Sequence, residues 1–290
     1  MADQPWTIRR LLEWTENFLR GKGSDSPRLE TQILLAHALC CRRIDLYTRT
    51  EEEPAESQRA AFRGLIQRRA EGAPVAYLVG QREFYSLAFE VTPAVLIPRP
   101  ETELLVMECL KLIKGKPSPR VLDVGTGSGN IAVSIANQHS TAQVTAIDIS
   151  AEALAVAARN AERHGLSGRI RFLQGDLFVP IPPGERFDVI VSNPPYVADA
   201  ELKELAPQVR DHEPRLALAA GAEGLDFFQR LIPGAPRFLE AGGSILVEIG
   251  AKQEDAVRKI VESVPGYCVQ KCFRDHAKLP RLIYATWEPA

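Results

Sequence analysis

The segment VLDVGTGSGNIAVSIA, residues 121–136, constrains the fold more than any other part of the chain. Four residues that suit a buried strand run into a turn with three glycines, and a helical pattern follows. Glycine permits tight backbone geometry and the close approach of a ligand. A strand, a glycine-rich turn and a helix in this order predict an α/β sheet that binds a nucleotide-like ligand at the carboxyl ends of its strands.

Strand and helix patterns alternate from this turn to the end of the chain. Apolar runs rich in β-branched residues predict strands, and apolar residues at helical spacing predict the helices between them. The predicted strands are residues 121–124, 144–148, 170–176, 187–193, 244–250, 267–275 and 281–287. This alternation is typical of a mostly parallel sheet, while the short link between the last two strands favours an antiparallel edge. The fold class is therefore α/β.

The chain before residue 101 divides into two further parts. Residues 1–75 carry a helical pattern, with Ser26 as the expected N-cap of a helix that starts at Pro27. Residues 76–100 are rich in aromatic and β-branched residues and predict a β-hairpin or an extended linker. We therefore predict a helical domain over 1–75, the linker over 76–100 and the α/β domain over 101–290.

Charge and hydropathy argue against several classes of protein. The chain has 35 basic and 37 acidic side chains, a formal net charge of −2, and neither part is strongly basic. Stable nucleic-acid binding is therefore not expected. No apolar run approaches the roughly 20 residues that a membrane-spanning helix needs. The N-terminus lacks the apolar core of a signal peptide, so we expect a cytoplasmic protein without membrane contact, with a monomer as the default state.

Cysteine and histidine usage gives no indication of a metal site. The five cysteines are an odd number without CxxC pairs, and the five histidines complete no zinc spacing. Cys268 and Cys272 would lie on one face of a strand, and we expect them to be buried structural thiols.

Acidic residues at the ends of three successive strands indicate which ligand binds. Asp123 precedes the glycine turn and could hold an ammonium group, Asp148 is placed to accept hydrogen bonds from two ribose hydroxyls, and Asp176 suits an adenine amino group. NAD is the alternative, but its GxGxxG pattern needs a glycine where this chain has Asn130. A ligand with adenine, ribose and a cationic amino-acid end is S-adenosylmethionine. The turn residues expected to contact it are Gly125, Thr126, Gly127, Ser128 and Gly129.

The fourth predicted strand ends in Asn193-Pro194-Pro195-Tyr196, which would face the same crevice. A motif of the form (D/N/S)PP(Y/F) after strand four is the signature of amino-methyltransferases that act on planar nitrogens. With DVGTGSGN and Asp148, the α/β domain resembles a class I S-adenosylmethionine-dependent methyltransferase. That resemblance implies that Asn193 lies near both the cofactor and the substrate.

Four segments narrow the resemblance further. They are IPRPETELLV, GQREFYSLAFEV, NPPYV and HEPRLALAAGAEGLDFFQRLI. Together they resemble the bacterial release factor glutamine methyltransferases (the HemK/PrmC family) over nearly the whole chain. The resemblance implies methyl transfer to the side-chain amide nitrogen of the glutamine in the GGQ motif of class 1 peptide chain release factors, which would modulate translation termination. One departure is Leu177, where the family often has tryptophan; the resemblance implies a cofactor contact at this position, and Phe178 is adjacent.

The family reaction suggests a role for each residue of the NPPY motif. An amide nitrogen is a poor nucleophile, because its lone pair is delocalised into the carbonyl. The side-chain carbonyl of Asn193 and the backbone carbonyl of Pro194 can accept its two N–H bonds and so orient it. Pro195 stiffens the chain, and Tyr196 can stack on the planar amide and exclude water.

Weaker candidates flank this site. Glu101, Thr102 and Glu103 could border the cofactor entrance or simply cap the following helix. Glu213 and Arg215 are expected to brace the loop after the active site.

Three other functions fit parts of the sequence. A glutamine methyltransferase of a ribosomal protein shares NPPY, but tends to have PRS in place of PRPETE. A DNA or RNA amino-methyltransferase would use the same pocket for a base, against which the near-neutral charge argues. A non-enzymatic helical interaction module would not need Asp123, the glycine turn, Asp148 and Asn193 together.

Overall fold

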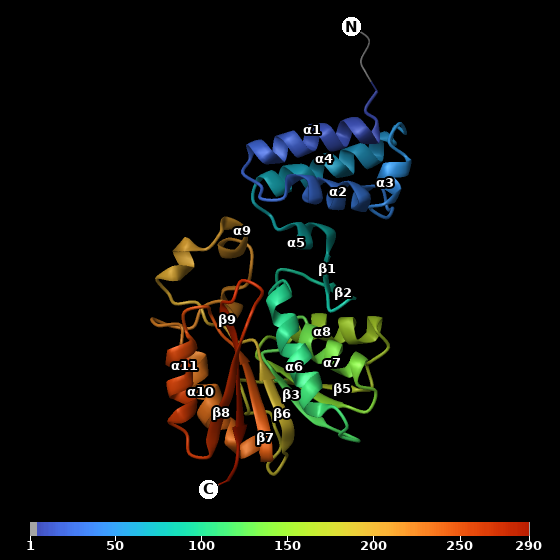
Figure 1. Cartoon of the computed structure of the whole chain (residues 1–290). Coiled ribbons are helices and arrows are strands. Elements are labelled where there is room, and N and C mark those ends of the chain that lie inside the picture. Colours follow the sequence, from blue (N-terminus) through green and yellow to red (C-terminus); the bar gives the residue numbers. More distant parts are fainter. Residues whose placement is uncertain (1–4, 290) are drawn as a thin grey trace. The chain divides into compact units, whose positions relative to one another are not determined.

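The computed structural model describes residues 5–289, which form two compact units (Figure 1). The first unit contains the chain up to Gly80 together with Pro207–His212, and the second contains Gln81–Ala206 and Glu213 onward. The first unit has one buried apolar cluster and the second unit has two. Within the described residues, no helix is both long and apolar enough to cross a membrane.

The first unit is helical, as its sequence pattern predicts. Its helices are α1 (Ile8–Gly21), α2 (Pro27–Ala38), α3 (Asp45–Thr48), α4 (Glu56–Ala70), α5 (Val75–Val79) and α9 (Pro207–Arg210). Ser26 is the N-cap of α2 and Pro27 its first residue, as expected, but the serine side chain makes no capping hydrogen bond. The apolar faces of α1, α2 and α4 meet around Leu34, Leu35 and Phe62, which are almost completely buried.

The second unit begins with the predicted hairpin. Strand β1 (Gln81–Phe84) pairs antiparallel with β2 (Leu87–Glu90). The two turn residues, Tyr85 and Ser86, have φ angles of 49° and 60°. Positive φ at both central residues is the geometry that matches the twist of a two-residue hairpin. The Asn160 side chain exchanges hydrogen bonds with the Glu90 backbone, N–H and carbonyl alike, and thereby ties the hairpin to the helix that contains Asn160.

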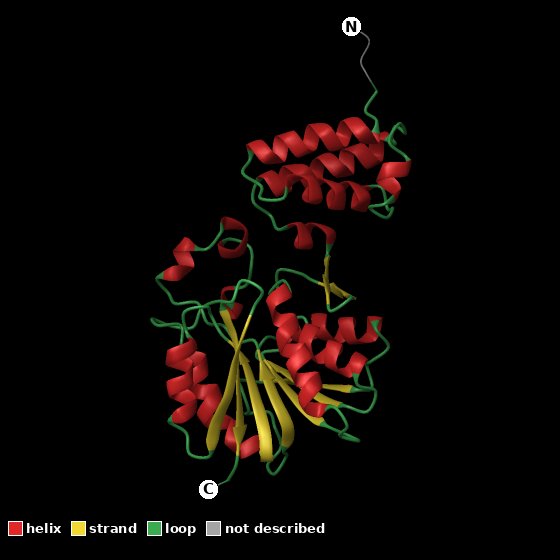
Figure 2. Cartoon of the chain, viewed as in Figure 1, coloured by secondary structure: helices red, strands yellow, loops and turns green. Residues whose placement is uncertain are grey.

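The rest of the second unit is built around a seven-stranded sheet with the order β5-β4-β3-β6-β7-β9-β8 (Figures 1 and 2). The strands are β3 (Arg120–Val124), β4 (Gln143–Asp148), β5 (Ile170–Gln174), β6 (Phe187–Ser192), β7 (Leu239–Glu248), β8 (Tyr267–Arg274) and β9 (Pro280–Trp287). Strands β3 to β7 pair in parallel, and β9 is antiparallel to both β7 and β8. The α/β fold with an antiparallel pair at its edge is therefore confirmed.

The strand order creates a switch point between β3 and β6. The chain builds outward from β3 through β4 to β5, and then returns to place β6 on the other side of β3. In open α/β sheets a ligand binds in the crevice at the carboxyl ends of the strands where the order reverses. The glycine turn follows β3 and the NPPY motif follows β6, so both lie at this crevice.

Helices cover both faces of the sheet. One apolar cluster joins the sheet to α6 (Glu103–Ile113), α7 (Asn130–Gln138) and α8 (Ala151–Arg163), and the other joins it to α10 (Asp226–Gly234) and α11 (Glu254–Glu262). Figure 1 shows these two sets on opposite sides. Val121 belongs to the first cluster and its neighbour Leu122 to the second, because successive strand residues point to opposite faces.

The two cysteines of β8 differ from the expectation of buried thiols. Cys268 is exposed and Cys272 is partly buried. The pairing of β8 with β9 shifts register between Val269 and Lys271. Such a bulge alters which side chains share a face, and a period-2 pattern does not reveal it.

Candidate active site

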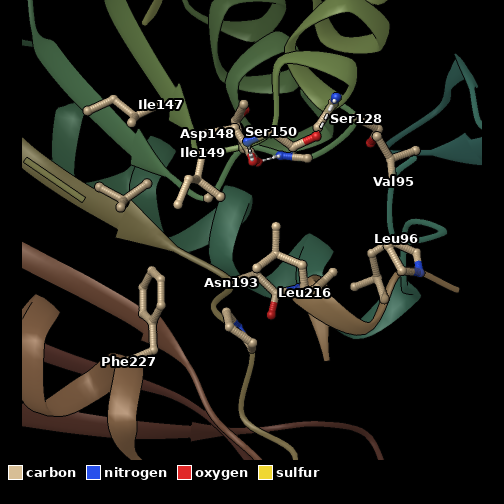
Figure 3. A pocket seen from close by; sticks show the side chains of 18 of the residues that line it. Val95, Leu96, Ser128, Ile147, Asp148, Ile149, Ser150, Asn193, Leu216 and Phe227 are labelled. Carbon is tan, nitrogen blue, oxygen red and sulfur yellow. Dashed lines mark hydrogen bonds between the residues drawn. The ribbon is translucent and has the colours of Figure 1, made fainter. Parts of the chain in front are cut away.

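A cavity of about 450 Å³ opens at the carboxyl ends of β3, β4, β5 and β6. Figure 3 shows Asp148, Ser150 and Ser128 along one wall and Asn193 and Leu216 across from them. Ile147, Ile149 and Phe227 gather at one end, and Val95 and Leu96 lie at the other. Polar groups of the glycine turn and Asp148 therefore face Asn193 across the cavity, within a lining that also contains many apolar residues.

The glycine turn is folded onto the neighbouring strand by its own backbone. The N–H groups of Gly125 and Thr126 both donate to the carbonyl of Ile147, each at 2.9 Å. Gly129 has φ +78°, and a Cβ atom there would lie 3.0 Å from Cβ of Ala157 on α8. A side chain at this position would therefore be strained and would push α8 away.

Four of the five turn residues predicted to contact the cofactor line the cavity, and Gly129 does not. The four are Gly125, Thr126, Gly127 and Ser128. Gly129 is instead the left-handed N-cap of α7, which begins at Asn130.

Asp148 lies at the end of β4, on the cavity wall. Its Oδ2 accepts a hydrogen bond from the Gly127 N–H at 2.8 Å, and its Oδ1 accepts one from the Ser150 N–H at 2.9 Å. Burial raises its pKa, and these backbone hydrogen bonds oppose the rise. A carboxylate has about four acceptor sites, so these backbone contacts do not use all of them. Asp148 is thus held rigidly with acceptor capacity left over.

Asp123 is completely buried and is not among the lining residues. Its Oδ2 accepts a hydrogen bond from the Thr126 hydroxyl at 2.7 Å, while Oδ1 has no partner among the described residues. Burial raises the pKa of this carboxyl to about 7, against the lowering effect of the Thr126 hydrogen bond. Asp123 therefore lies behind the glycine turn. It is connected to the cavity by its hydrogen bond to Thr126, which lines the cavity, and by the charge of its own carboxylate. Direct contact with a ligand's ammonium group stays a prediction.

The residues after β5 are only partly placed as expected. Asp176 lines the cavity, but its carboxylate forms an ion pair with Arg230 of α10. Leu177 also lines the cavity and has a φ of 50°, an uncommon conformation for a non-glycine residue. Phe178 points elsewhere, because its ring stacks on that of Phe238 with 4.8 Å between centroids. An adenine contact from Leu177 stays a prediction.

Sequence reasoning missed three apolar residues that line the cavity. Ile149 is 50% exposed and Leu216 is 61% exposed, values that are unusual for such side chains. Phe227 of α10 is the aromatic residue at the apolar end of the cavity in Figure 3. The segment LDFFQRLI does contain a signal, because two adjacent phenylalanines in a helix point in different directions. Phe228 is completely buried, and Phe227 faces the cavity.

The NPPY motif is anchored at both ends. Before it, the Ser192 hydroxyl donates to the carbonyl of Val124 at 2.7 Å, which joins the ends of β6 and β3. After it, the Gln253 side chain donates to the carbonyl of Tyr196 at 3.0 Å. Asn193 and Pro195 line the cavity, whereas Pro194 and Tyr196 do not. Burial raises the pKa of the Tyr196 phenol to about 12. The substrate roles of Pro194 and Tyr196 stay predictions.

The Asn193 side chain is oriented by a residue of the PRPETE segment. Its Nδ2 donates to the hydroxyl of Thr102 at 3.1 Å. Thr102 is almost completely buried, ends the short helix η1 (Pro100–Thr102) and also lines the cavity. With the nitrogen engaged, the Asn193 carbonyl oxygen remains as an acceptor.

Glu213 braces the loop that closes one side of the cavity, as predicted. Its carboxylate accepts from the Ile97 N–H at 3.1 Å and forms an ion pair with Arg99 at 2.5 Å. The same loop pairs with the chain after NPPY, where Val197 donates to Leu218 at 2.8 Å. Among the described residues no group of three or more metal-ligating side chains comes together.

Comparison with known proteins identifies the family. Residues 10–80 match the model of the PrmC N-terminal domain, and residues 116–283 match that of a methyltransferase domain. The release factor glutamine methyltransferase of Rhodopirellula baltica is 49% identical over 97% of this chain and 96% of its own length. The chain belongs to the release factor glutamine methyltransferase family. The relative of the same name from Geobacter sulfurreducens is 45% identical over 94% of each chain.

Solved structures of other methyltransferases share the fold of this family member. The hMettl16 catalytic domain has a TM-score of 0.56 at 17% identity and covers 77% of this chain and 80% of its own. A methyltransferase from Pyrococcus furiosus has a TM-score of 0.51 at 20% identity, covering 71% and 91%. The resemblance predicted from NPPYV and IPRPETELLV is thus confirmed, and the chain is a methyltransferase.

Proposed function

We propose that this methyltransferase transfers a methyl group from S-adenosylmethionine to the side-chain amide nitrogen of the glutamine in the GGQ motif of class 1 release factors. The observation that carries the proposal is the Asn193 carboxamide, held beside the glycine turn and Asp148 with its carbonyl available. The relatives at 45–49% identity, named for this activity, support it. We further propose that the enzyme acts in the cytoplasm, with a monomer as its default state.

The cavity residues fit the proposed cofactor. Asp148 offers unused acceptor sites for ribose hydroxyls, and Phe227 and Ile149 offer apolar surface for a planar base. The buried carboxylate of Asp123, with one oxygen unpartnered among the described residues, supplies negative charge for a cationic group. When bound, S-adenosylmethionine supplies a methyl group attached to a positively charged sulfur.

The protein's contribution to the reaction is to bind and orient the acceptor nitrogen. The Asn193 Oδ1 and the Pro194 carbonyl accept the two N–H bonds of the substrate amide, which fixes the nitrogen for attack. By accepting these N–H bonds, the two oxygens increase the electron density on the nitrogen while its proton becomes acidic. No strong base is needed beforehand, because the proton can leave late. Tyr196 is proposed to stack on the amide.

The helical unit is proposed to bind the release factor. Its helices carry no catalytic constellation in the sequence, yet residues 10–80 match a domain model of their own. We propose that residues 1–75 contact the protein substrate while the linker over 76–100 sets their orientation to the catalytic domain over 101–290.

The test is methyl transfer from labelled S-adenosylmethionine to a panel of purified acceptors. The panel contains a class 1 release factor, its GGQ-to-GGA variant, a large-subunit ribosomal protein and duplex DNA. We expect label on the GGQ protein and none on the GGA variant. Label on the ribosomal protein or DNA alone would contradict the proposed substrate while keeping a planar-nitrogen acceptor.

A further inference from the structure

We propose that the Asn130 side chain and the Ser128 N–H bind the carboxylate at the amino-acid end of the cofactor. The inference rests on the proposed cofactor, S-adenosylmethionine, and not on the identity of the methyl acceptor. Asn130 stands where a dinucleotide-binding turn has a glycine. It is the first residue of α7 and it lines the cavity. Its side chain can therefore reach a bound ligand, which a glycine could not do.

A hydrogen bond to Ser128 orients the Asn130 carboxamide. The Ser128 hydroxyl donates to Oδ1 of Asn130 at 3.2 Å. Nδ2 of Asn130 carries two N–H donors, and neither has a partner among the described residues. Asn130 thus offers donors, rather than its acceptor, to a ligand in the cavity.

The backbone of the glycine turn leaves one further donor. The N–H groups of Gly125, Thr126 and Gly127 donate to acceptors of β4, and the Gly129 N–H donates to the carbonyl of Thr126. The N–H of Ser128, a residue that is 2% exposed, makes no hydrogen bond within the part of the chain that the structure describes. A buried N–H is costly to leave unpaired. A carboxylate has two oxygens that only accept, so it can satisfy this N–H and the neighbouring carboxamide together.

The arginines on the cavity wall are less suited to this carboxylate. Among the described residues, the cationic side chains that line the cavity are Arg99 and Arg230. Arg99 pairs with Glu213, and Arg230 pairs with Asp176. A ligand carboxylate at either arginine would compete with the carboxylate that is already there, whereas one at Asn130 displaces no ion pair.

The place of these donors agrees with the direction of the proposed cofactor. Figure 3 shows Ser128 on the side of Asp148 that is away from Phe227. With the base at Phe227 and the ribose at Asp148, the amino-acid end extends toward Ser128. The N-terminus of α7, whose N-cap Gly129 has no capping side chain, adds positive partial charge at the same place.

The experiment measures the binding of two ligands by isothermal titration calorimetry, without the protein substrate. The ligands are S-adenosylmethionine and its decarboxylated analogue, which keeps the adenine, ribose, sulfonium and ammonium groups. Asn130→Ala should raise the Kd of S-adenosylmethionine about 10- to 100-fold, because a hydrogen bond to a charged group is lost. The Kd of the decarboxylated analogue should change less than about threefold, because the analogue lacks the group that Asn130 binds.

Asn130→Asp separates the carboxylate contact from damage to the fold. An aspartate keeps an acceptor for the Ser128 hydroxyl and suits the start of a helix, but it places a negative charge beside the ligand carboxylate. It should weaken S-adenosylmethionine at least as much as Asn130→Ala does, and should not weaken the decarboxylated analogue. Asn137→Ala and Asn137→Asp are the matched controls, since Asn137 is an exposed residue of the same helix that does not line the cavity. Both controls should bind the two ligands as wild type does.

The outcomes distinguish this inference from the proposed function. Equal effects of the Asn130 variants on both ligands, or no effect on either, would overturn the carboxylate contact and leave the proposed function standing. A change confined to the KM of the release factor would also overturn it, because the carboxylate would then belong to the protein substrate. A loss selective for S-adenosylmethionine, in an enzyme that methylates no release factor, would support the contact and reject the proposed function. Wild type that binds neither ligand would reject both.

Discussion

Replacing Asp148 by asparagine tests the cofactor site with almost no change in shape. The carboxylate accepts from the backbone N–H groups of Gly127 and Ser150, one on each oxygen. An asparagine has a single acceptor atom, so its NH₂ group must face either one of these donors or the ribose hydroxyls. The variant therefore loses at least one hydrogen bond to a charged acceptor in the complex.

The expected loss of affinity follows from that count. A hydrogen bond to a charged group contributes about 1.5–3 kcal/mol, and each 1.4 kcal/mol is about tenfold in Kd. Asp148→Asn should therefore weaken S-adenosylmethionine binding by roughly 10- to 150-fold. Isothermal titration calorimetry measures this directly, without the protein substrate.

Asp188→Asn is the matched control for Asp148→Asn. Asp188 also accepts a backbone hydrogen bond, from Arg120 at 2.8 Å, but it lies at the other end of its strand and does not line the cavity. Its Kd should equal that of wild type. A Kd for Asp148→Asn within about threefold of wild type would refute the assignment of Asp148 to the ribose.

Three further changes have separate expected outcomes. Asn193→Ala should lower kcat at least about 100-fold while S-adenosylmethionine affinity changes far less, measured by single turnover and calorimetry; equal turnover would refute its role. Asp123 has a folded-state pKa raised to about 7, so the unfolded chain loses its proton first and stability falls as pH rises from about 4 to 7. Asp123→Asn should therefore remove about 3 kcal/mol of this fall between pH 5 and pH 8, measured by urea unfolding at the two pH values, and an unchanged pH dependence would contradict the raised pKa. Deleting residues 1–75 should raise KM for the release factor without changing cofactor affinity, and an unchanged KM would remove the proposed docking role.

The sequence predicted the elements of the fold because their patterns are local. Strand-forming runs, the glycine turn and the proline at the start of α2 each act within a few residues. The insertion of β9 between β7 and β8 was not predictable in this way, since it depends on pairing between distant segments. The register shift between Cys268 and Cys272 on β8 has the same origin.

The candidate site was predicted where a residue ends a strand or follows it directly. Asp148 and Asn193 lie on the cavity because the ends of parallel strands share one edge of the sheet. Partners that come from other elements were not predicted: the Arg230 that pairs with Asp176, the Phe227 at the apolar end, and the Thr102 that holds Asn193. These contacts depend on how helices pack, which short motifs do not encode.

The most direct test of the central claim is to locate the methyl group by tandem mass spectrometry on a release factor incubated with the enzyme and S-adenosylmethionine. We predict a single added methyl group on the side-chain amide of the GGQ glutamine, and none when Asn193 is replaced by alanine under the same conditions. A methyl group on any other residue of the release factor, or equal modification by the Asn193 variant, would contradict the account.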